Sequence, residues 1–252
     1  MLIDTHCHIH EKDYPNAEGA YTRAVEAGVS QMICVGTDED SSARAVAFAS
    51  NHEGAWASVG LHPHDATEGV TAIKSLRALL QNDTNNTIVA VGECGLDFFY
   101  DNSPREAQIE MLHAQLRLAQ EFKKPVIFHV REAFADFWPI IDQYEDITGV
   151  IHSFTDTEVT LKEAISRGFS IGVNGIATFA KDKQAMYAAI PINSICLETD
   201  APFLTPVPHR GTVNEPALLT LVATHIANLQ SINLEELSQA TERCALDTFS
   251  LT

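Results

Sequence analysis

Two histidines separated by one residue follow a short apolar run near the start of the sequence. Leu2 and Ile3 precede His6 and His8. On an extended backbone, residues i and i+2 point to the same side, so both imidazoles can face one small volume. Imidazole is the commonest metal ligand among side chains. A polar loop after a strand is the alternative interpretation, so a metal site requires further ligands from the rest of the chain.

Other side chains that can bind metal follow further apolar runs of the chain. They are Glu93, His129, His152 and Asp200, each at the end of a predicted strand, together with the pair His62 and His64. Chance rarely places so many such residues at strand ends. The pattern therefore predicts that His6, His8, Glu93, His129, His152 and Asp200 share one site.

Four histidines and two carboxylates are too many ligands for one tetrahedral zinc ion, and they suit two metals bridged by a carboxylate. Glu93 is the expected bridge, because the fourth strand lies centrally among those that carry ligands. Such a site lowers the pKa of a bound water and stabilises both the attacking and the leaving oxygen of a displacement reaction. Asp200 could bind a metal and also deprotonate the water as general base. The alternatives are a buried ion-paired carboxylate for Glu93 and a helix cap for Asp200.

Strands and helices alternate along the sequence in a way that would position these residues. The predicted strands are short apolar runs rich in Val, Ile and Ala, which suit parallel strands covered on both faces. They cover residues 2–4, 31–36, 55–60, 88–93, 125–129, 149–152, 169–173 and 194–200. Helical patterns fall near residues 16–28, 39–51, 70–82, 103–124, 134–143, 157–167, 180–189, 215–229 and 234–248.

The clearest of these helices begins after residue 102. Ser103 can cap it, Pro104 suits its first position and Glu106 completes a capping box. Lys123 and Lys124 fall in its predicted last turn, where positive charge favours the helix dipole. Eight strands that alternate with helices predict a single (β/α)₈ TIM-barrel domain over residues 1–252, with its active site at the carboxyl ends of the strands. An open doubly wound sheet is the alternative, but no GxGxxG motif supports it.

Composition and charge restrict the class of protein. No apolar run is long enough to cross a bilayer, the N-terminus resembles no signal peptide, and no CxxC pair occurs among five cysteines. We therefore expect a cytoplasmic protein with reduced thiols and no membrane association. Net charge is −18, from 34 acidic against 16 basic residues, with no Lys/Arg cluster. This excludes a protein that binds long duplex DNA through a basic stripe.

Six segments, in order along the chain, resemble the TatD-type metal-dependent deoxyribonucleases of the amidohydrolase-like superfamily. They are DTHCHI (4–9), GLHPH (60–64), VGECGLDFFY (91–100), KPVIFHVREA (124–133), GVIHSFT (149–155) and LETDAPFLTPVPHRG (197–211), followed by Asn214-Glu215-Pro216. The chain departs from the family pattern at His10, where an acidic residue is frequent. None of the six predicted ligand positions is disturbed.

The resemblance implies a (β/α)₈ barrel with two divalent cations and the same six ligands. It implies hydrolysis of phosphodiester bonds in DNA, often from the 3′ end, and activity with Mg or Mn. The four imidazoles suit Zn, Ni, Mn or Fe better than Mg, so Mg, Mn, Zn and Ni all remain candidates. The expected partner is a DNA strand end or a short single strand, gripped mostly by the metals. No protein partner is predicted.

Five further residues are candidates for contact with the substrate. His62 and His64 flank a proline after the third strand, and one could contact a phosphate. Arg131 follows His129 by two residues, so it could grip a phosphate bidentately or form a salt bridge with a neighbouring carboxylate. His209 and Arg210, in a proline-rich loop, could meet the substrate backbone or form a solvated turn.

Two other functions remain open. One is a metal-dependent hydrolase of another bond, such as an ester, an amide or an aminoacyl-tRNA, because one fold and metal site hosts many chemistries. The other is a metal-binding protein without activity, against which intact Glu93 and Asp200 argue. Enzymes that bridge their metals with a modified lysine on the fourth strand are disfavoured, because Glu93 occupies that position.

Overall fold

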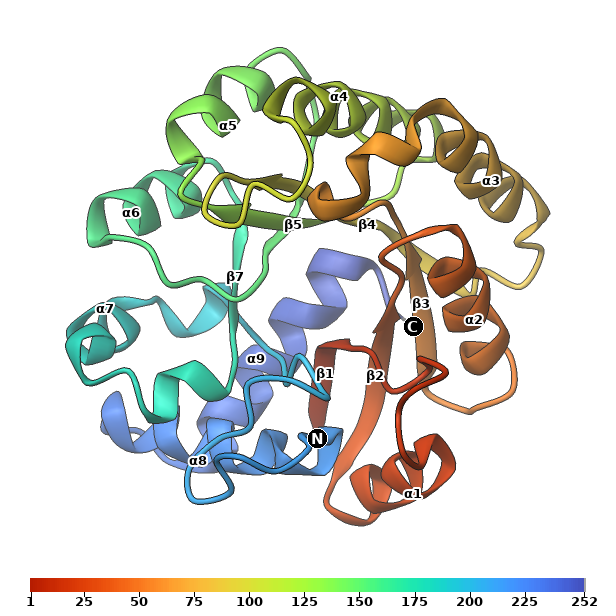
Figure 1. Ribbon diagram of the computed structural model, residues 1–252. Coiled ribbons are helices and arrows are strands. Elements are labelled where there is room, and N and C mark those ends of the chain that lie inside the picture. Colours follow the sequence, from red (N-terminus) through yellow and green to blue (C-terminus); the bar gives the residue numbers. More distant parts are fainter. Residues whose placement is uncertain (252) are drawn as a thin grey trace.

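Residues 1–251, which the computed structural model describes, contain eight parallel strands arranged as a nearly closed barrel (Figure 1). The strands pair in sequence order and are β1 (Leu2–Cys7), β2 (Val29–Val35), β3 (Ala55–Val59), β4 (Ile88–Asp97), β5 (Val126–Arg131), β6 (Gly149–Ile151), β7 (Ser170–Val173) and β8 (Ile195–Leu197). A parallel bridge between Cys7 and Ala201 joins the first strand to the chain after the last. The predicted TIM barrel is therefore confirmed.

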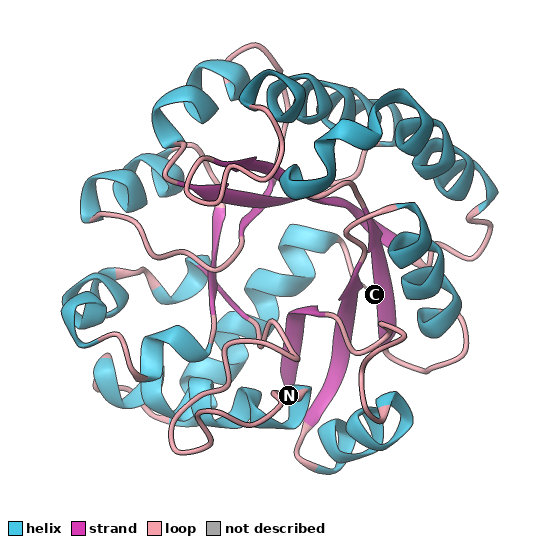
Figure 2. Ribbon diagram, viewed as in Figure 1, coloured by secondary structure: helices cyan, strands magenta, loops and turns pink. Residues whose placement is uncertain are grey.

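Helices surround the strands on the outside (Figure 2). They are α1 (Ala17–Glu26), α2 (Glu39–Ala49), α3 (Gly69–Asn82), α4 (Arg105–Phe122), α5 (Phe134–Ile141), α6 (Glu158–Ser166), α7 (Gln184–Ala189), α8 (Leu219–Leu229) and α9 (Leu234–Phe249). Short 3-10 turns are η1 (Pro63–Glu68), η2 (Gly175–Thr178), η3 (Lys181–Lys183), η4 (Ile192–Ser194) and η5 (Pro216–Leu218). Helix α9 crosses behind the centre of the barrel in Figure 1, where its Cys244 and Phe249 pack against inward-facing strand residues.

Helix α4 shows how the sequence pattern produces packing and where the prediction of its ends was wrong. Its buried Leu112 and Leu116 lie one turn apart, so one stripe of the helix faces the barrel. The predicted serine cap does not form, because Ser103 Oγ donates to the carbonyl of His64 at 2.6 Å and Pro104 occupies the cap. The helix ends before Lys123, which adopts a left-handed conformation, and Lys124 Nζ donates to the Ile88 carbonyl at 2.6 Å.

The strands that carry the candidate ligands differ in length from the prediction. Strand β4 continues to Asp97, so Glu93 lies inside it, because β5 also continues and pairs with its last four residues. Strand β8 ends at Leu197, and Asp200 follows on a loop where its own φ is +57°. The carboxyl half of β4 requires glycine at residue 95, where φ is +153° and a Cβ would lie 1.9 Å from the His129 carbonyl oxygen.

No single helix of residues 1–251 is long and apolar enough to cross a membrane. The bent pair Pro216–Leu229 and Leu234–Phe249 reaches that length and composition only when both helices are counted together.

Candidate metal centre

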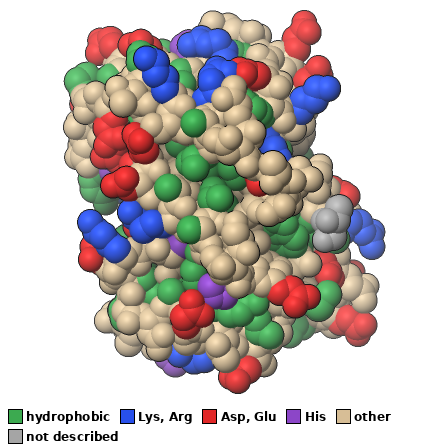
Figure 3. All heavy atoms as spheres, turned by 90° about the vertical axis from the view of Figure 1, so that its right-hand side faces the viewer, with side chains coloured by type: hydrophobic (Ala, Val, Ile, Leu, Met, Phe, Trp, Pro, Cys, Tyr) green, Lys and Arg blue, Asp and Glu red, His purple; other side chains and the backbone are tan. Residues whose placement is uncertain are grey.

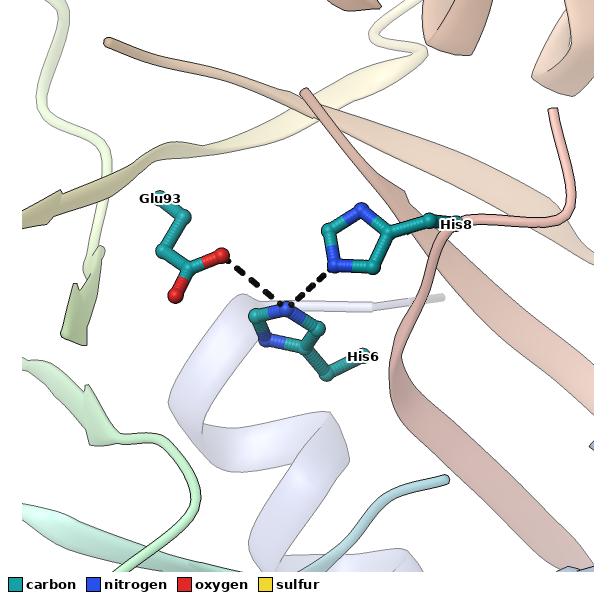
Figure 4. A group of neighbouring side chains, drawn as sticks. All are labelled: His6, His8 and Glu93. Atoms are coloured by element: carbon teal, nitrogen blue, oxygen red, sulfur yellow. Dashed lines mark hydrogen bonds and ion pairs between the residues drawn. The ribbon is translucent and has the colours of Figure 1, made fainter. Parts of the chain in front are cut away.

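Three buried side chains converge at the carboxyl end of the barrel: His6 of β1, His8 directly after this strand, and Glu93 of β4 (Figure 4). His6 Nε2 lies 3.1 Å from His8 Nε2 and 3.3 Å from Glu93 Oε2. The alternation of side chains along β1 brings both histidines to one side, as the sequence predicts, while Cys7 between them is buried in the core. These three residues could hold one metal ion.

The other carboxylate oxygen of Glu93 faces a second group of histidines. Glu93 Oε1 lies 2.9 Å from His129 Nδ1, 3.1 Å from His152 Nε2 and 3.7 Å from His62 Nε2. His62, Glu93 and His129 form another group able to hold a metal. The two oxygens of one buried carboxylate thus face two different sets of nitrogen atoms.

Asp200 completes the cluster from the loop after β8. Its Oδ1 lies 3.3 Å from His8 Nε2 and 3.8 Å from His6 Nε2. Its backbone N–H donates to the His6 carbonyl at 2.8 Å, which fixes the loop to β1. The structure therefore brings together all six residues that the sequence predicts as ligands.

The ionisation of the cluster suits a divalent cation. Burial raises the pKa of Glu93, but His152 and His6 lower it further, so its pKa lies well below the usual value. Burial raises the pKa of Asp200, but the hydrogen bond to His8 and the nearby rings of His152, His6 and His8 together lower it below its usual value. Burial, with His152 nearby, lowers the pKa of His6 and leaves its ring neutral. Ionised carboxylates and neutral imidazoles are the forms that bind metal.

Two further observations fit a bound cation. Burial lowers the pKa of His152 and of His129, but the neighbouring carboxylates raise both above the usual value, so each of these rings holds a proton that a bound cation would displace. The buried atoms His6 Nδ1 and Glu198 Oε2 lack hydrogen-bond partners. Imidazole and carboxylate donors at this density match the ligand preferences of Zn, Mn or Ni.

Sequence reasoning missed two buried carboxylates that contact the candidate ligands. Asp97 has no exposed surface, and its Oδ2 accepts from His129 Nε2 and His64 Nε2, both at 3.0 Å. Its Oδ1 accepts from the N–H groups of Phe99 and Tyr100 at 3.0 and 2.9 Å. Asp97 therefore leaves Nδ1 of His129 free to face Glu93. Its position four residues after Glu93 on a strand was the available signal, because i and i+4 share a face.

Glu198 is the second missed carboxylate. It is fully buried, and its Oε1 accepts from the Ser153 N–H at 2.7 Å and from Asn174 Nδ2 at 3.1 Å. The same oxygen lies 3.3 Å from His152 Nδ1. The absent side chain of Gly172 leaves room for it, because a Cβ there would lie 2.4 Å from Glu198 Oε2. Its place two residues before Asp200 in the sequence was the signal.

A cleft opens over the cluster. One part, of about 270 Å³, is lined by His8, Thr37, His62, Asp65, Glu93, His129, His152, Asp200 and Phe203. An adjoining part of about 630 Å³ adds His64, Asp97, Tyr100, Val130, Arg131, Ser153, Thr155, Ile176 and Leu204. Of the described residues that line it, Arg131 is the only Lys or Arg. On the face shown in Figure 3, basic side chains are interspersed with acidic ones.

The candidate substrate contacts divide into two groups. His62, His64 and Arg131 line the cleft, and the Arg131 guanidinium lies over the rings of Phe99 and Tyr100, at 4.1 and 4.8 Å, instead of in a salt bridge. His209 and Arg210 are not among the residues that line it. Arg210 lies 3.9 Å over the Phe179 ring and donates to the Thr205 carbonyl. His10 is buried beside Glu11 and Ser41, with its ring 6.2 Å from that of His8, and it is not among the residues that line the cleft.

Comparison with known proteins places this chain in a family. The model of the TatD related DNases matches residues 3–250. A Bacillus subtilis protein, the uncharacterized metal-dependent hydrolase YabD, is 34% identical over the full length of both chains. The 3′-5′ ssDNA/RNA exonuclease TatD of Cronobacter sakazakii is 37% identical and covers 81% of each chain.

A solved structure agrees with these sequence matches. The TatD homologue YjjV from Escherichia coli K12 has a TM-score of 0.93 and 30% identity, and the match covers 100% of this chain and 98% of that one. Fold, family match and sequence identity over the whole barrel lead to one conclusion. The chain belongs to the TatD family of metal-dependent hydrolases.

Proposed function

We propose that this protein is a cytoplasmic exonuclease that removes nucleotides from the 3′ end of single-stranded DNA with two divalent metal ions. His6, His8, Glu93, His129, His152 and Asp200 are the proposed ligands. The observation that carries the proposal is the position of Glu93, whose two oxygens face separate groups of histidines. The name of the C. sakazakii relative supports a single-stranded nucleic acid as substrate and attack from the 3′ end.

The carboxylate of Glu93 suits a bridge between two cations better than a single-ion ligand. Its Oε2 faces His6 at 3.3 Å, and its Oε1 faces His129 at 2.9 Å and His152 at 3.1 Å. A single tetrahedral ion uses four ligands, so two of the six proposed ligands would not contact it. Two cations satisfy all six proposed ligands and offset the charge of Glu93 and Asp200.

The metals, when bound, would supply an acidified water and positive charge beside the phosphate. The other tasks belong to the chain itself. Ionised Asp200 accepts a proton from the attacking water, because its carboxylate lies at the open side of the cluster and lines the cleft. The Arg131 guanidinium binds a non-bridging phosphate oxygen. His62 and His64, which also line the cleft, contact the leaving portion of the strand.

The test uses single-stranded oligonucleotides labelled at the 3′ or the 5′ end, with Mn, Mg or chelator. Metal content of the purified protein is measured first by elemental analysis. We expect metal-dependent release of the 3′ label first, and loss of this activity in Glu93→Gln. The exposed Asp136 on α5 offers a matched control, since Asp136→Asn also removes one negative charge. A metal-loaded protein that cleaves no oligonucleotide contradicts the proposal, and hydrolysis of small esters or amides would then be tested.

A further inference from the structure

Three exposed aromatic side chains lie around the mouth of the cleft. Phe99, Tyr100 and Phe203 expose 50%, 54% and 60% of their surface. Tyr100 and Phe203 line the cleft, and Phe99 contacts Tyr100 edge to face at 4.8 Å. Single exposed apolar residues are ordinary on protein surfaces, but a group beside a catalytic cluster indicates a binding surface.

The structure holds the Tyr100 side of the cleft in a fixed position. Asp97 accepts the backbone N–H groups of Phe99 and Tyr100, so the same carboxylate anchors this loop and the ring of His129. The Tyr100 ring meets His64 edge to face at 5.6 Å. The guanidinium carbon of Arg131 lies over both aromatic rings, and its N–H groups make no hydrogen bond to the described residues, so they remain available to an anion.

Phe203 lines both parts of the cleft and is also anchored. Its N–H donates to the Asp200 carbonyl at 2.8 Å, and its own carbonyl accepts from Asn214 Nδ2 at 2.6 Å. Its ring meets His8 edge to face at 6.4 Å. Both aromatic residues are thus positioned close to the metal cluster. Tyr100 contacts Asp97 and His64, and Phe203 contacts Asp200 and His8.

We propose that Tyr100 and Phe203 are base-stacking subsites for unpaired nucleotides next to the scissile phosphate, with Arg131 contacting the phosphate between them. This deepens the proposed nuclease function and rests on it. Aromatic rings bind bases of any sequence, since every base has a stacking face. A base paired within a duplex already stacks on its neighbours and is not free to stack on these rings. The pair of subsites therefore selects single strands without sequence preference.

The cleft favours nucleotides over a protein or a membrane as the occupant. Three aromatic rings and one guanidinium around a cation-binding cluster match the alternation of bases and phosphates along a strand. The net charge of −18 opposes binding to anionic lipid, whereas one strand end needs positive charge only at the metals and Arg131. The volume of about 630 Å³ is of the size that holds a small-molecule ligand.

The experiment measures equilibrium binding of the metal-loaded protein to a fluorescent, phosphorothioate-protected thymidine octamer. A second octamer lacks the bases of its two 3′-terminal nucleotides. Wild type is expected to bind the intact octamer at least roughly 30-fold more tightly than the abasic one, because two stacked bases are lost together. Tyr100→Ala and Phe203→Ala should each reduce this ratio severalfold, and Tyr100→Trp should preserve it. Val159→Ala, which alters an exposed side chain of α6, is the matched control.

The outcomes separate this inference from the proposed function. Equal affinity of wild type for both octamers, or an unchanged ratio in both alanine variants, overturns the stacking subsites even if unprotected DNA is cleaved. A base-dependent affinity that the alanine variants lose supports them. Cleavage of an unprotected octamer and of methyl p-nitrophenyl phosphate is measured in parallel. If wild type cleaves neither substrate, the nuclease proposal fails independently of the binding result.

Discussion

Replacing Asp97 with asparagine is expected to weaken metal binding about 10- to 100-fold while leaving the metal-free fold intact. The carboxylate accepts N–H groups from His129 and His64 on one oxygen and from Phe99 and Tyr100 on the other. Burial raises the pKa of Asp97, but the hydrogen bonds from His129 and the Tyr100 N–H lower it more, so the group is ionised. Because an ionised carboxylate can only accept hydrogen bonds, its contact with His129 requires a proton on Nε2 of that ring.

An asparagine side chain has the same shape, but it replaces one of the two acceptor oxygens with an NH₂ group, which is a donor. Its amide oxygen can still accept from Phe99 and Tyr100, which places the NH₂ group against His129 Nε2. The imidazole proton must then move to Nδ1, the atom that lies 2.9 Å from Glu93 Oε1 and faces the proposed metal. Turning the amide around would leave two backbone donors without an acceptor, at about 1–3 kcal/mol each.

The expected loss follows from this change of tautomer. Disturbing the partner of a metal-ligating histidine typically weakens metal binding 10- to 100-fold, or about 1.4–2.7 kcal/mol. The assay is competition for Mn or Zn between chelator-stripped protein and a chromophoric chelator, together with thermal unfolding of the metal-free protein. Asp136→Asn controls for the lost charge. An Asp97→Asn protein with wild-type metal affinity would refute the reasoning, and so would an equal loss in the control.

Three further outcomes are expected. Burial raises the pKa of Glu11, but His10, Ser41 and Arg44 lower it to below its ordinary value, so Glu11 stabilises the fold above about pH 4.3 and loses this effect on acidification. The free energy of unfolding, measured with urea, should therefore fall less between pH 7 and pH 3 for Glu11→Gln than for wild type. An equal fall in the two proteins would contradict this. Gly95→Ala should destabilise the protein by about 1–3 kcal/mol or more, because of its positive φ and the close His129 carbonyl. Gly168→Ala, where φ is +84° and no atom lies within 4 Å of the added Cβ, is the milder control, and similar losses of stability in the two variants would count against the steric explanation. The log–log slope of DNA affinity against salt should be shallower than about −1.5, since Arg131 is the only basic side chain among the described residues that line the cleft, and a steep slope would indicate other phosphate contacts.

The barrel was predictable from sequence because parallel strands buried on both faces leave short apolar runs between amphipathic helices. The length of β4 was not. Gly95 and Asp97 are residue types that strands disfavour, so the sequence suggests an end at Glu93. In the structure the missing Cβ of Gly95 allows close contact with β5, and Asp97 is held by Gln108 through hydrogen bonds on both its N–H and its carbonyl.

The position of the proposed ligands was predictable for a simple reason. Residues at the carboxyl ends of barrel strands converge whatever lies between them in the sequence. Strand alternation could place Asp97 on the same face as Glu93, but which contacts the supporting residues make depends on side-chain geometry that no periodicity encodes. The bond of Asp97 to two histidines, the space that Gly172 leaves for Glu198, and the Arg131 guanidinium over Tyr100 all arise from packing between neighbouring strands and loops.

The bridge between Cys7 and Ala201 lies at the seam where the beginning and the end of the barrel meet. His6 and His8 stand on one side of this seam and Asp200 on the other. During synthesis, His6 and His8 are therefore made almost 200 residues before Asp200, which is a delay of roughly 10 to 40 s at ordinary translation rates. A cation that binds residues on both sides would stabilise the closed barrel. Because this stabilisation grows with ligand concentration, closure of the seam would depend on the concentration of free metal in the cell.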